Sequence, residues 1–462
     1  MPPMKNEQYV FLRSLIIQLC VIAISFISLG QDKGVACEIG DDFAFSADKW
    51  EQSADDFIVD HGKNGFRFVD NKRRDIAVCK TYGAVMCFGE SVMETRAYFR
   101  RKMMNRLEIS LFNKGDASIN EVQFSIKDLD ALIKRVSEKV NGGTKKMPQI
   151  VRVRVKNDRC RLGYKFMMKW PNRVPSAELS WGISGEDESK SVEYIRLVFE
   201  IKEVKGRDNV SIRAKKTSKQ SAGYQSNVKS NEEGDVYIAN VPMVDQGSKG
   251  YCSVATAERV LRYFGQSIDE HEIAQMAETS AEGGTSTKAM ISAVETIGKK
   301  CRLGKREIVA KLTDWEDGEK RLKEYNKFAK RLKKPELNIM DYIKTEGNSR
   351  TFYIGEMEQA MDAKVLKAMS MRDKSGYGKF IKGIREQTKR GVPLFWSVRL
   401  GLYPESGIPQ NAGGHMRLII GYNQEKGEVI YTDSWGAGHE RKYMPDDWAW
   451  TITHNLFYLN PR

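Results

Sequence analysis

The chain has 462 residues, of which 41% are hydrophobic and 10% aromatic, and its formal net charge is +14. This length is too great for one ordinary domain and suits two or three. The apolar content is sufficient for globular cores, which excludes a wholly disordered chain. The charge arises from 75 basic residues interleaved with 61 acidic ones. Because no nucleic-acid recognition motif accompanies this excess, we expect no nucleic-acid partner.

Residues 1–30 differ in composition from the rest of the chain. Basic residues precede an apolar stretch from Leu15 to Leu29, and the small residues Ser28 and Gly30 stand before Gln31. This is the layout of a secretory signal peptide, so the sequence predicts export to the periplasm, the cell envelope or the medium. The alternative is an uncleaved membrane anchor, although the stretch is shorter than the ~20 residues that span a bilayer. If uncleaved, this segment is the part of the protein expected to contact a membrane.

Residues 38–205 show a mixed pattern that predicts a separate α+β domain of unknown role. Apolar and polar residues alternate in Val151–Val155 and in Tyr194–Ile201, which indicates strands. The segment 125–140 begins with Ser125, a good helix cap, and carries apolar residues at helical spacing. This region contains no motif that marks a catalytic site.

The seven cysteines do not suggest a metal site. Neither the CxxC nor the HExxH spacing occurs, so we expect no zinc site and no cofactor. Cys79 and Cys87 flank a turn-like segment, and they are the expected disulfide pair if the compartment is oxidising.

Residues 206–235 are rich in Lys, Arg, Ser, Gln, Asn and Gly, with hardly any apolar side chain. This composition predicts a basic, flexible and protease-sensitive linker. Its place directly before the second domain makes it a candidate processing site. Residues before about 235 would then form an inhibitory pro-domain or a folding aid. A structural N-terminal domain is the alternative.

Residues 236–462 are predicted to form the second domain, again of the α+β class. A strand is expected at 236–241, a helix at 252–264 that ends at Gly265, and an amphipathic helix after Asp269. The charged run 305–350 is expected to be a solvated helical insertion. After a helix that ends near Arg390, the pattern predicts strands at 393–399, 415–422, 428–433 and 456–459.

The string Asp245-Gln246-Gly247-Ser248-Lys249-Gly250-Tyr251-Cys252 is the main chemical signal. A thiol attacks as its thiolate, and the dipole at a helix N-terminus favours that anion. Cys252 stands where the glycine-rich loop becomes a helix, so it is the candidate nucleophile. Its backbone N–H and the side chain of Gln246 are candidate donors to a developing oxyanion.

A base and a residue that orients it are expected downstream. Gly413-Gly414-His415 opens an apolar strand, and the next strand ends at Asp433. Two strands joined by a tight turn are antiparallel neighbours, which brings His415 and Asp433 to the same end of the hairpin. There the carboxylate can accept the imidazole N–H and turn the other ring nitrogen to the thiol. Trp435 either shields this pair from water or belongs to the core.

The remaining histidines are not expected to take part in catalysis. His271 lies among acidic residues on the polar side of a predicted helix, and His439 and His454 are expected to be solvated in polar loops. His61 lies in the other predicted domain.

These motifs resemble those of the papain superfamily, in which Gln-Gly-Ser-x-Gly-x-Cys opens the catalytic helix and Asn-Ser-Trp-Gly closes the site. More narrowly, the segments 241–246 and 251–256 and the Gly-Gly-His motif look like those of bacterial C39-like peptidases. The resemblance implies a helical half and an antiparallel β half with a cleft between them. It also implies that Cys252 is the nucleophile, His415 the base, Asp433 the orienting residue and Gln246 the oxyanion donor of a cysteine peptidase.

The sequence departs from the papain pattern at three positions. Lys249 replaces a cysteine, Ser253 replaces a tryptophan and Asp433 replaces an asparagine, and the first two changes favour the C39-like branch. The expected activity is hydrolysis of a peptide or protein substrate. The alternatives are an inactive binding module on a peptidase fold and a thiol acyltransferase of the transglutaminase kind, since transfer and hydrolysis share an acyl-enzyme. The sequence does not predict the oligomeric state.

Overall fold

The computed structural model describes residues 36–114, 125–142, 148–156, 162–184, 190–201, 223–246, 251–266, 273–274, 287–312, 315–346, 349–408 and 412–461. These residues form helices and antiparallel sheets, in agreement with the predicted α+β class. The predicted signal segment 1–30 and the amphipathic helix expected after Asp269 lie outside the described residues, except for Ile273 and Ala274 of the latter. None of the described helices is both long and apolar enough to cross a membrane.

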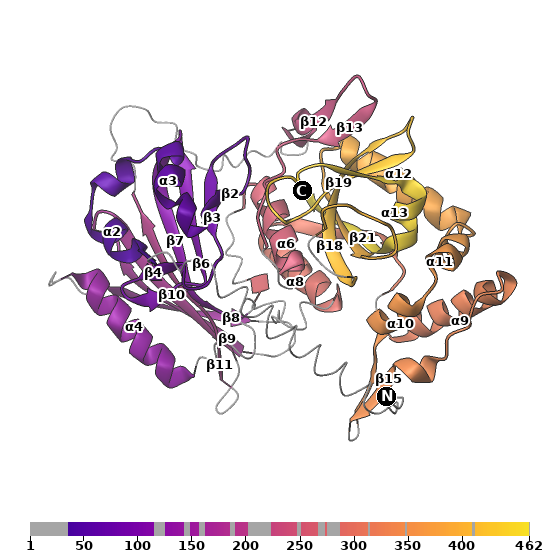
Figure 1. The fold of residues 1–462 in the computed structure, drawn as a ribbon, viewed down its shortest axis with the longest axis horizontal. Coiled ribbons are helices and arrows are strands. Elements are labelled where there is room, and N and C mark those ends of the chain that lie inside the picture. The colour runs from indigo at the N-terminus through magenta and orange to yellow at the C-terminus, as the bar shows by residue number, and fades with distance from the viewer. Residues whose placement is uncertain are drawn as a thin grey trace, which may run out of the picture.

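An eight-stranded antiparallel sheet organises the N-terminal part (indigo to purple in Figure 1), with the strand order β2-β3-β6-β7-β11-β10-β9-β8. It confirms both strands predicted in this region. The strands are β2 (Arg67–Phe68), β3 (Ile76–Cys79), β6 (Glu94–Arg100), β7 (Met103–Asn113), β8 (Gln149–Lys156), β9 (Leu162–Trp170), β10 (Ser176–Ser184) and β11 (Ser191–Glu200). A small sheet joins β1 (Cys37–Glu38), β4 (Val85–Cys87) and β5 (Glu90–Ser91).

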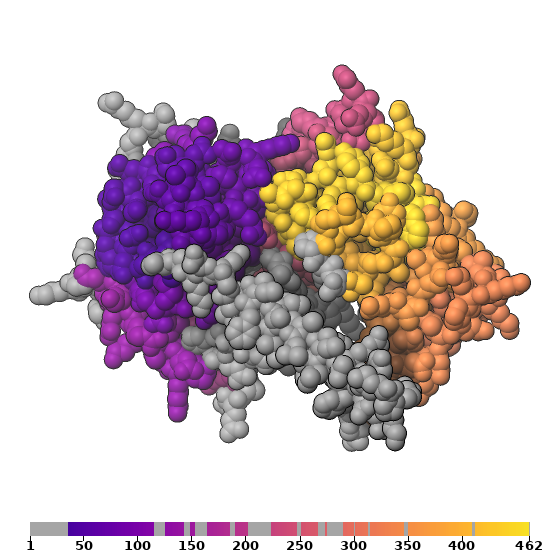
Figure 2. Space-filling model, in the orientation of Figure 1, coloured from indigo at the N-terminus to yellow at the C-terminus, as the bar shows by residue number. Residues whose placement is uncertain are grey.

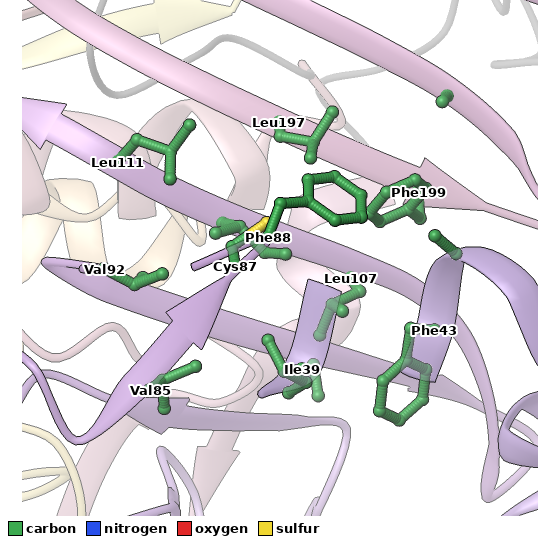
Figure 3. Packing of buried hydrophobic residues seen from close by; sticks show 14 of the residues in the cluster. Ile39, Phe43, Val85, Cys87, Phe88, Val92, Leu107, Leu111, Leu197 and Phe199 are labelled. Atoms are coloured by element: carbon green, nitrogen blue, oxygen red, sulfur yellow. The ribbon is translucent and has the colours of Figure 1, made fainter. Parts of the chain in front are cut away.

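Helices cover one face of this sheet. They are α2 (Ile39–Phe45), α3 (Ala54–His61) and α4 (Ile126–Asn141), with the 3₁₀ turns η1 (Asp48–Glu51) and η2 (Gly62–Asn64). The helix predicted at 125–140 is confirmed, because Ser125 and Asp128 form a capping box that satisfies N–H groups at the start of α4. Figure 3 shows part of the core beneath these helices, in which Phe43 of α2 belongs to the same buried cluster as the strand residues Leu107 and Phe199.

The predicted disulfide between Cys79 and Cys87 is wrong for this structure, in which both thiols are free and buried. The Sγ atom of Cys79 contacts the carbonyl oxygen of Asn64 at 3.2 Å. Cys87 packs against Gly40 of α2, where an added Cβ atom would lie 2.6 Å from its Sγ. Both cysteines therefore serve as small core residues.

A second sheet organises the C-terminal part, with the order β12-β13-β18-β17-β21-β14 and with β19 and β20 added beside β18. It confirms the predicted β pattern of the last seventy residues or so. The strands are β12 (Val228–Ser230), β13 (Asp235–Ile238), β14 (Leu303–Ala310), β17 (Leu394–Arg399), β18 (Gly414–Asn423), β19 (Glu428–Thr432), β20 (Lys442–Pro445) and β21 (Thr453–Pro461).

This sheet starts before the predicted boundary at 236. The end of the expected linker 206–235 forms η4 (Gln225–Asn227) and β12, which pairs with β13. Tyr224 provides the reason, since its ring packs on Tyr263 and Phe264 with centroids 5.6 and 5.1 Å apart. The residues of the expected linker before Gly223 lie outside the described part.

Helices lie on both faces of the C-terminal sheet. On one face, α6 (Cys252–Tyr263) and α8 (Thr287–Lys300) share a core with Phe395 of β17 and Leu418 of β18. On the other face, α12 (Lys374–Lys389) and α13 (Asp446–Ile452) share a core with Trp396 and Ile419. Successive strand residues point to opposite faces, so a sheet covered on both sides has continuously apolar strands.

The charged run 305–350 is only partly a solvated helical insertion. It begins in β14, which pairs with β21 as the edge strand of the sheet. It continues in α9 (Trp315–Arg331), which exposes Lys and Glu side chains but buries Leu322 and Tyr325 in a separate small core. This core also includes residues of α10 (Ile354–Ala360) and α11 (Ala363–Ser370), with the 3₁₀ turn η5 (Ile339–Tyr342) and the hairpin of β15 (Ile343–Glu346) and β16 (Ser349–Phe352) nearby.

A buried ionic cluster joins this insertion to the sheet. His454 lies in β21 with its Nε2 atom 2.8 Å from a carboxylate oxygen of Glu358, which also forms an ion pair with Arg321 at 2.9 Å. The expectation that His454 is solvated is therefore wrong. Its side chain is buried because the insertion folds back over the end of β21.

Candidate functional site

The nucleophile candidate lies at the start of α6, as predicted. Cys252 is the first residue of the helix, and Gly265, with φ of +73°, follows its end. The hydroxyl group of Thr256 donates a hydrogen bond to the Cys252 carbonyl oxygen at 2.6 Å and lies 3.1 Å from the Met416 carbonyl oxygen of β18. These contacts fix the first turn of α6 against the strand that carries His415. Cys252 as a whole residue is 8% exposed.

His415 and Asp433 meet at the end of the β18–β19 hairpin. The register of β18 and β19 pairs Leu418 with Thr432, so Asp433, one residue further on, lies beside the first residues of β18, which include His415. The Nε2 atom of His415 is 2.5 Å from Oδ1 of Asp433. An ionised carboxylate can only accept, so the proton of this hydrogen bond belongs to Nε2. The Nδ1 atom is then the nitrogen available to Cys252.

Burial and neighbouring charges have opposite effects on the pKa values of Cys252 and His415. Burial alone would raise the pKa of the Cys252 thiol, but the neighbouring His415 side chain and its imidazolium charge outweigh burial and lower that pKa below the ordinary value. Burial would likewise lower the pKa of His415, but the charge of Asp433 and the hydrogen bond with it raise that pKa to about 9. Both shifts favour a thiolate–imidazolium pair over the neutral thiol and imidazole.

The carboxylate of Asp433 is paired with a buried arginine that the sequence analysis missed. Arg417 is fully buried, and its Nε atom lies 2.9 Å from Oδ2 of Asp433. Its other two nitrogens bond both carboxylate oxygens of Glu405 at 2.8 and 3.1 Å. Burial would raise the pKa of Asp433, but Arg417 and then His415 lower it to about 2. Asp433 therefore remains charged throughout the neutral range.

Arg259 forms a second link beneath the site. It lies about two turns along α6 from Cys252, on the same face. Its guanidinium group donates to the carbonyl oxygens of Pro242 and Asp433, each at 2.7 Å. Arg259 therefore ties the segment before Gln246 to the strand end that carries Asp433.

Signals for both arginines were present in the sequence. Arg417 is a charged residue inside an otherwise apolar strand, two positions after His415 and hence on the same face. Arg259 interrupts the apolar face of α6. Glu405 offered no comparable local signal, since it lies in a loop and reaches Arg417 only through the tertiary fold.

Gln246 lies next to the segment that follows Asp433. Its backbone N–H donates to the carbonyl oxygen of Ser434 at 2.7 Å, and its side-chain oxygen accepts a hydrogen bond from the Ser434 hydroxyl group. That bond assigns the oxygen of the amide and leaves its NH₂ group as the donor end. The loop 247–250 lies outside the described residues.

Trp435 covers the imidazole. The two rings are parallel to within 2° with centroids 4.4 Å apart, and Trp435 is also buried. The sequence left open whether Trp435 shields the His415–Asp433 pair or belongs to the core. In the structure its ring does both, since it is buried and covers one face of the imidazole. Beside it, His439 is half-buried rather than solvated and meets the Trp435 ring edge-on at 5.6 Å.

No residues in the described part of the chain form a group of three or more His, Cys, Asp or Glu side chains that could hold a metal ion. The chemistry available at the site is that of a cysteine, a histidine and a buried carboxylate. A cysteine at the head of a helix that packs on an antiparallel sheet bearing a histidine–carboxylate pair defines the papain-like class of domain.

Comparison with known families gives the same answer. Residues 238–457 match the model of the Peptidase_C39 like family. This part of the chain is a papain-like, C39-like peptidase domain. No curated protein and no solved structure matches the chain.

Proposed function

We propose that the C-terminal domain hydrolyses peptide bonds with Cys252 as the nucleophile. The observation that carries this proposal is His415, which lies between the thiol and a carboxylate that Arg417 keeps charged. Substrate is proposed to bind in a cleft between the helical half, which carries Cys252, and the β half, which carries His415.

The proposed reaction follows from these roles. The Cys252 thiolate attacks the carbonyl carbon, and the Cys252 backbone N–H and the Gln246 amide stabilise the oxyanion. The His415 imidazolium then donates its Nδ1 proton to the leaving amine, which yields the acyl-enzyme. In the second half, neutral His415 removes a proton from water, and the hydroxide formed releases the acid. Asp433 keeps the other proton on Nε2 throughout.

Alkylation with iodoacetamide at pH 6 tests the nucleophile. Cys252 should react ahead of Cys37, Cys79 and Cys87, because burial is the largest influence on these three thiols and raises the pKa of each. The Cys252→Ala variant should lose the fast labelling. Equal labelling of all cysteines would contradict the proposal.

Turnover separates hydrolysis from its alternatives. The purified full chain is incubated with a peptide library, with and without an amine acceptor, and the products are identified by mass spectrometry. We expect free acids from the wild type and none from Cys252→Ser. Amide products that form only with the amine present would indicate an acyltransferase. Binding without any product would indicate an inactive module.

We further propose that residues 1–30 are removed during export. The support is the apolar run Leu15 to Leu29, which ends at small residues. Mass spectrometry of the mature protein should find an N-terminus near Gln31. Recovery of Met1 in a membrane fraction would show an anchor instead.

A further inference from the structure

One face of the N-terminal sheet is turned toward the peptidase domain. On β7, Leu107 and Ile109 point into the core beneath the helices, so the alternating residues point to the opposite face. At the end of β7 the register with β11 shifts, since Ile195 pairs with Phe112 and Arg196 with Ser110. This bulge brings Asn113 onto the face opposite the helices.

An apolar contact and an ion pair join this face to the peptidase domain. Met243 packs among Val69, Ile76 and Val78 in a small core shared by the two domains. Arg96 of β6 lies 3.6 Å from Glu258 of α6, and both side chains are at least nine-tenths buried. Figure 1 shows α6 on the side of the peptidase domain nearest the N-terminal sheet, and Figure 2 shows the surfaces of the two domains meeting. Buried contacts of this kind suit a lasting interface.

Two further contacts fall on the residues beside Gln246 and Cys252. Arg67 of β2 donates to the carboxylate of Asp245 at 2.7 Å, and the Asp245 side chain is only 4% exposed. At the other end of the loop, the hydroxyl group of Tyr251 donates to Oδ1 of Asn113 at 2.9 Å.

Asp245 also contacts the other half of the site. It forms an isolated β-bridge with Trp435, the residue that stacks on His415. Its carboxylate packs against Gly436, where an added Cβ atom would lie 3.1 Å from Oδ2. When the Asp245 side chain is held in place, the adjacent Gln246 backbone is therefore also held against Ser434 and Trp435.

We propose that the N-terminal domain is a lasting part of the catalytic unit, in which Arg67 and Asn113 act as positioning residues for Gln246 and Cys252. This inference rests on the proposed function and adds to it. An inhibitory pro-domain could be removed without loss of activity. Removal of this domain would instead take away the contacts at Asp245 and Tyr251, which hold the neighbouring Gln246 and Cys252 in place. A displacement of about 1 Å in such a group is sufficient to slow turnover by up to ~10²-fold.

The test uses the full chain with Arg67→Ala, Arg67→Lys and Tyr251→Phe, and Arg74→Ala is the matched control. Arg74 also lies in the N-terminal domain and donates to an aspartate at 2.7 Å, but its partner is Asp55 of the same domain. We measure kcat and KM on a cleaved peptide, the alkylation rate of Cys252 at pH 6, and thermal unfolding.

We expect Arg67→Ala and Tyr251→Phe each to lower kcat about tenfold. Cys252 alkylation should change less than about twofold, because His415 rather than Arg67 controls the thiolate. Arg67→Lys should restore part of the loss, since an ammonium group can still pair with Asp245. If Arg67 and Tyr251 had a structural role alone, their replacement would lower the unfolding temperature, but it would not reduce kcat while leaving the alkylation rate of Cys252 nearly unchanged.

Three results would overturn the inference. If kcat of Arg67→Ala and Tyr251→Phe matches that of Arg74→Ala, the contacts position nothing. If kcat rises, the N-terminal domain is inhibitory. If wild-type protein shows neither fast Cys252 alkylation nor turnover, the peptidase proposal fails and this one fails with it, whereas the first two results leave the peptidase proposal intact.

Discussion

Trp435 lies flat on His415, with the two ring planes within 2° of each other and their centroids 4.4 Å apart. The indole therefore covers the imidazole beside its hydrogen bond to Asp433. In a region without water, the attraction between imidazolium and carboxylate is stronger than in solvent. The stack thus adds to the burial that lowers the pKa of His415, while it strengthens the attraction to Asp433, which outweighs burial and raises this pKa to about 9.

Replacement of Trp435 tests this shielding. Trp435→Ala should admit water to the His415–Asp433 pair and weaken both the effect of burial and the attraction to Asp433. Because the raising influences are the greater in total, the pKa of His415 should move back toward 6.5 and the alkaline limb of kcat/KM to lower pH. The cavity should also reduce the free energy of unfolding by about 3–5 kcal/mol. Trp435→Phe keeps a ring on the imidazole and should retain most of the wild-type profile. A folded Trp435→Ala with an unchanged alkaline limb would show that the indole is only a core residue.

Asp433→Asn is expected to be more harmful than the papain-like pattern suggests, because Arg417 competes for the amide oxygen. Arg417 can only donate, and its Nε atom lies 2.9 Å from one oxygen of Asp433. If the amide oxygen faces Arg417, the NH₂ group faces Nε2 of His415 and favours the wrong tautomer. We expect kcat to fall on the order of 10²-fold or more.

The double variant Asp433→Asn/Arg417→Gln provides the control. Without the guanidinium group the amide can turn its oxygen to His415, so the double variant should recover part of the lost kcat. The single variant Arg417→Gln corrects for the effect of the second change, and circular dichroism confirms folding. Equal kcat for the single Asp433→Asn and the double variant would show that Arg417 does not set the amide orientation.

The parts of the fold that were predicted are those with local signals. The capping box at Ser125 and the alternation in β8 and β11 are written within a few consecutive residues. The His415–Asp433 contact follows from a short hairpin, in which chain connectivity alone fixes the neighbours.

The prediction for His454 was wrong, and the contact between Arg67 and Asp245 was missed, because both depend on residues that are distant in sequence. His454 was expected in a polar loop because its neighbours in sequence are polar, but Glu358 and Arg321 come from a distant insertion and supply its buried partners. Arg67 and Asp245 likewise belong to different domains, and one ion pair among so many charges has no signature in sequence. Contacts that depend on how separate elements pack are set by the whole fold, and local propensity does not encode them.

The cluster at Glu358 should anchor the helical insertion. Glu358→Ala leaves the buried Arg321 guanidinium and the His454 imidazole without their carboxylate partner and should reduce the free energy of unfolding by about 3 kcal/mol. Glu356→Ala is the matched control, since this residue lies in the same helix but is 52% exposed and pairs with Lys344 at 3.4 Å. Its effect should stay within about 0.5 kcal/mol. If Glu358→Ala and Glu356→Ala lose the same free energy of unfolding in urea, the Glu358 cluster does not anchor the insertion.

The same cluster predicts an acid dependence. Burial opposes ionisation of Glu358, but His454 and Arg321 lower its pKa to about 2. A carboxylate with a lowered pKa stabilises the fold above its unfolded pKa, and this contribution is lost as pH falls from about 4.5 toward about 2. Wild-type stability should therefore fall more steeply than that of Glu358→Gln across this range, as measured by thermal unfolding at each pH.

The pH dependence of Cys252 reactivity tests the ion pair directly. Because the pKa of Cys252 is lowered and that of His415 is raised to about 9, the reactive pair should form at a lower pH than an ordinary thiol ionises and persist up to about pH 9. Above about 9, His415 loses the proton that the leaving amine requires, so kcat/KM should decline while alkylation of the thiolate continues.

In His415→Ala, burial is the largest influence left on Cys252 and raises its pKa, so alkylation should need a pH above the ordinary value of 9.0. If the alkylation profiles of the two proteins coincide, His415 does not ionise the thiol and another group must supply the base.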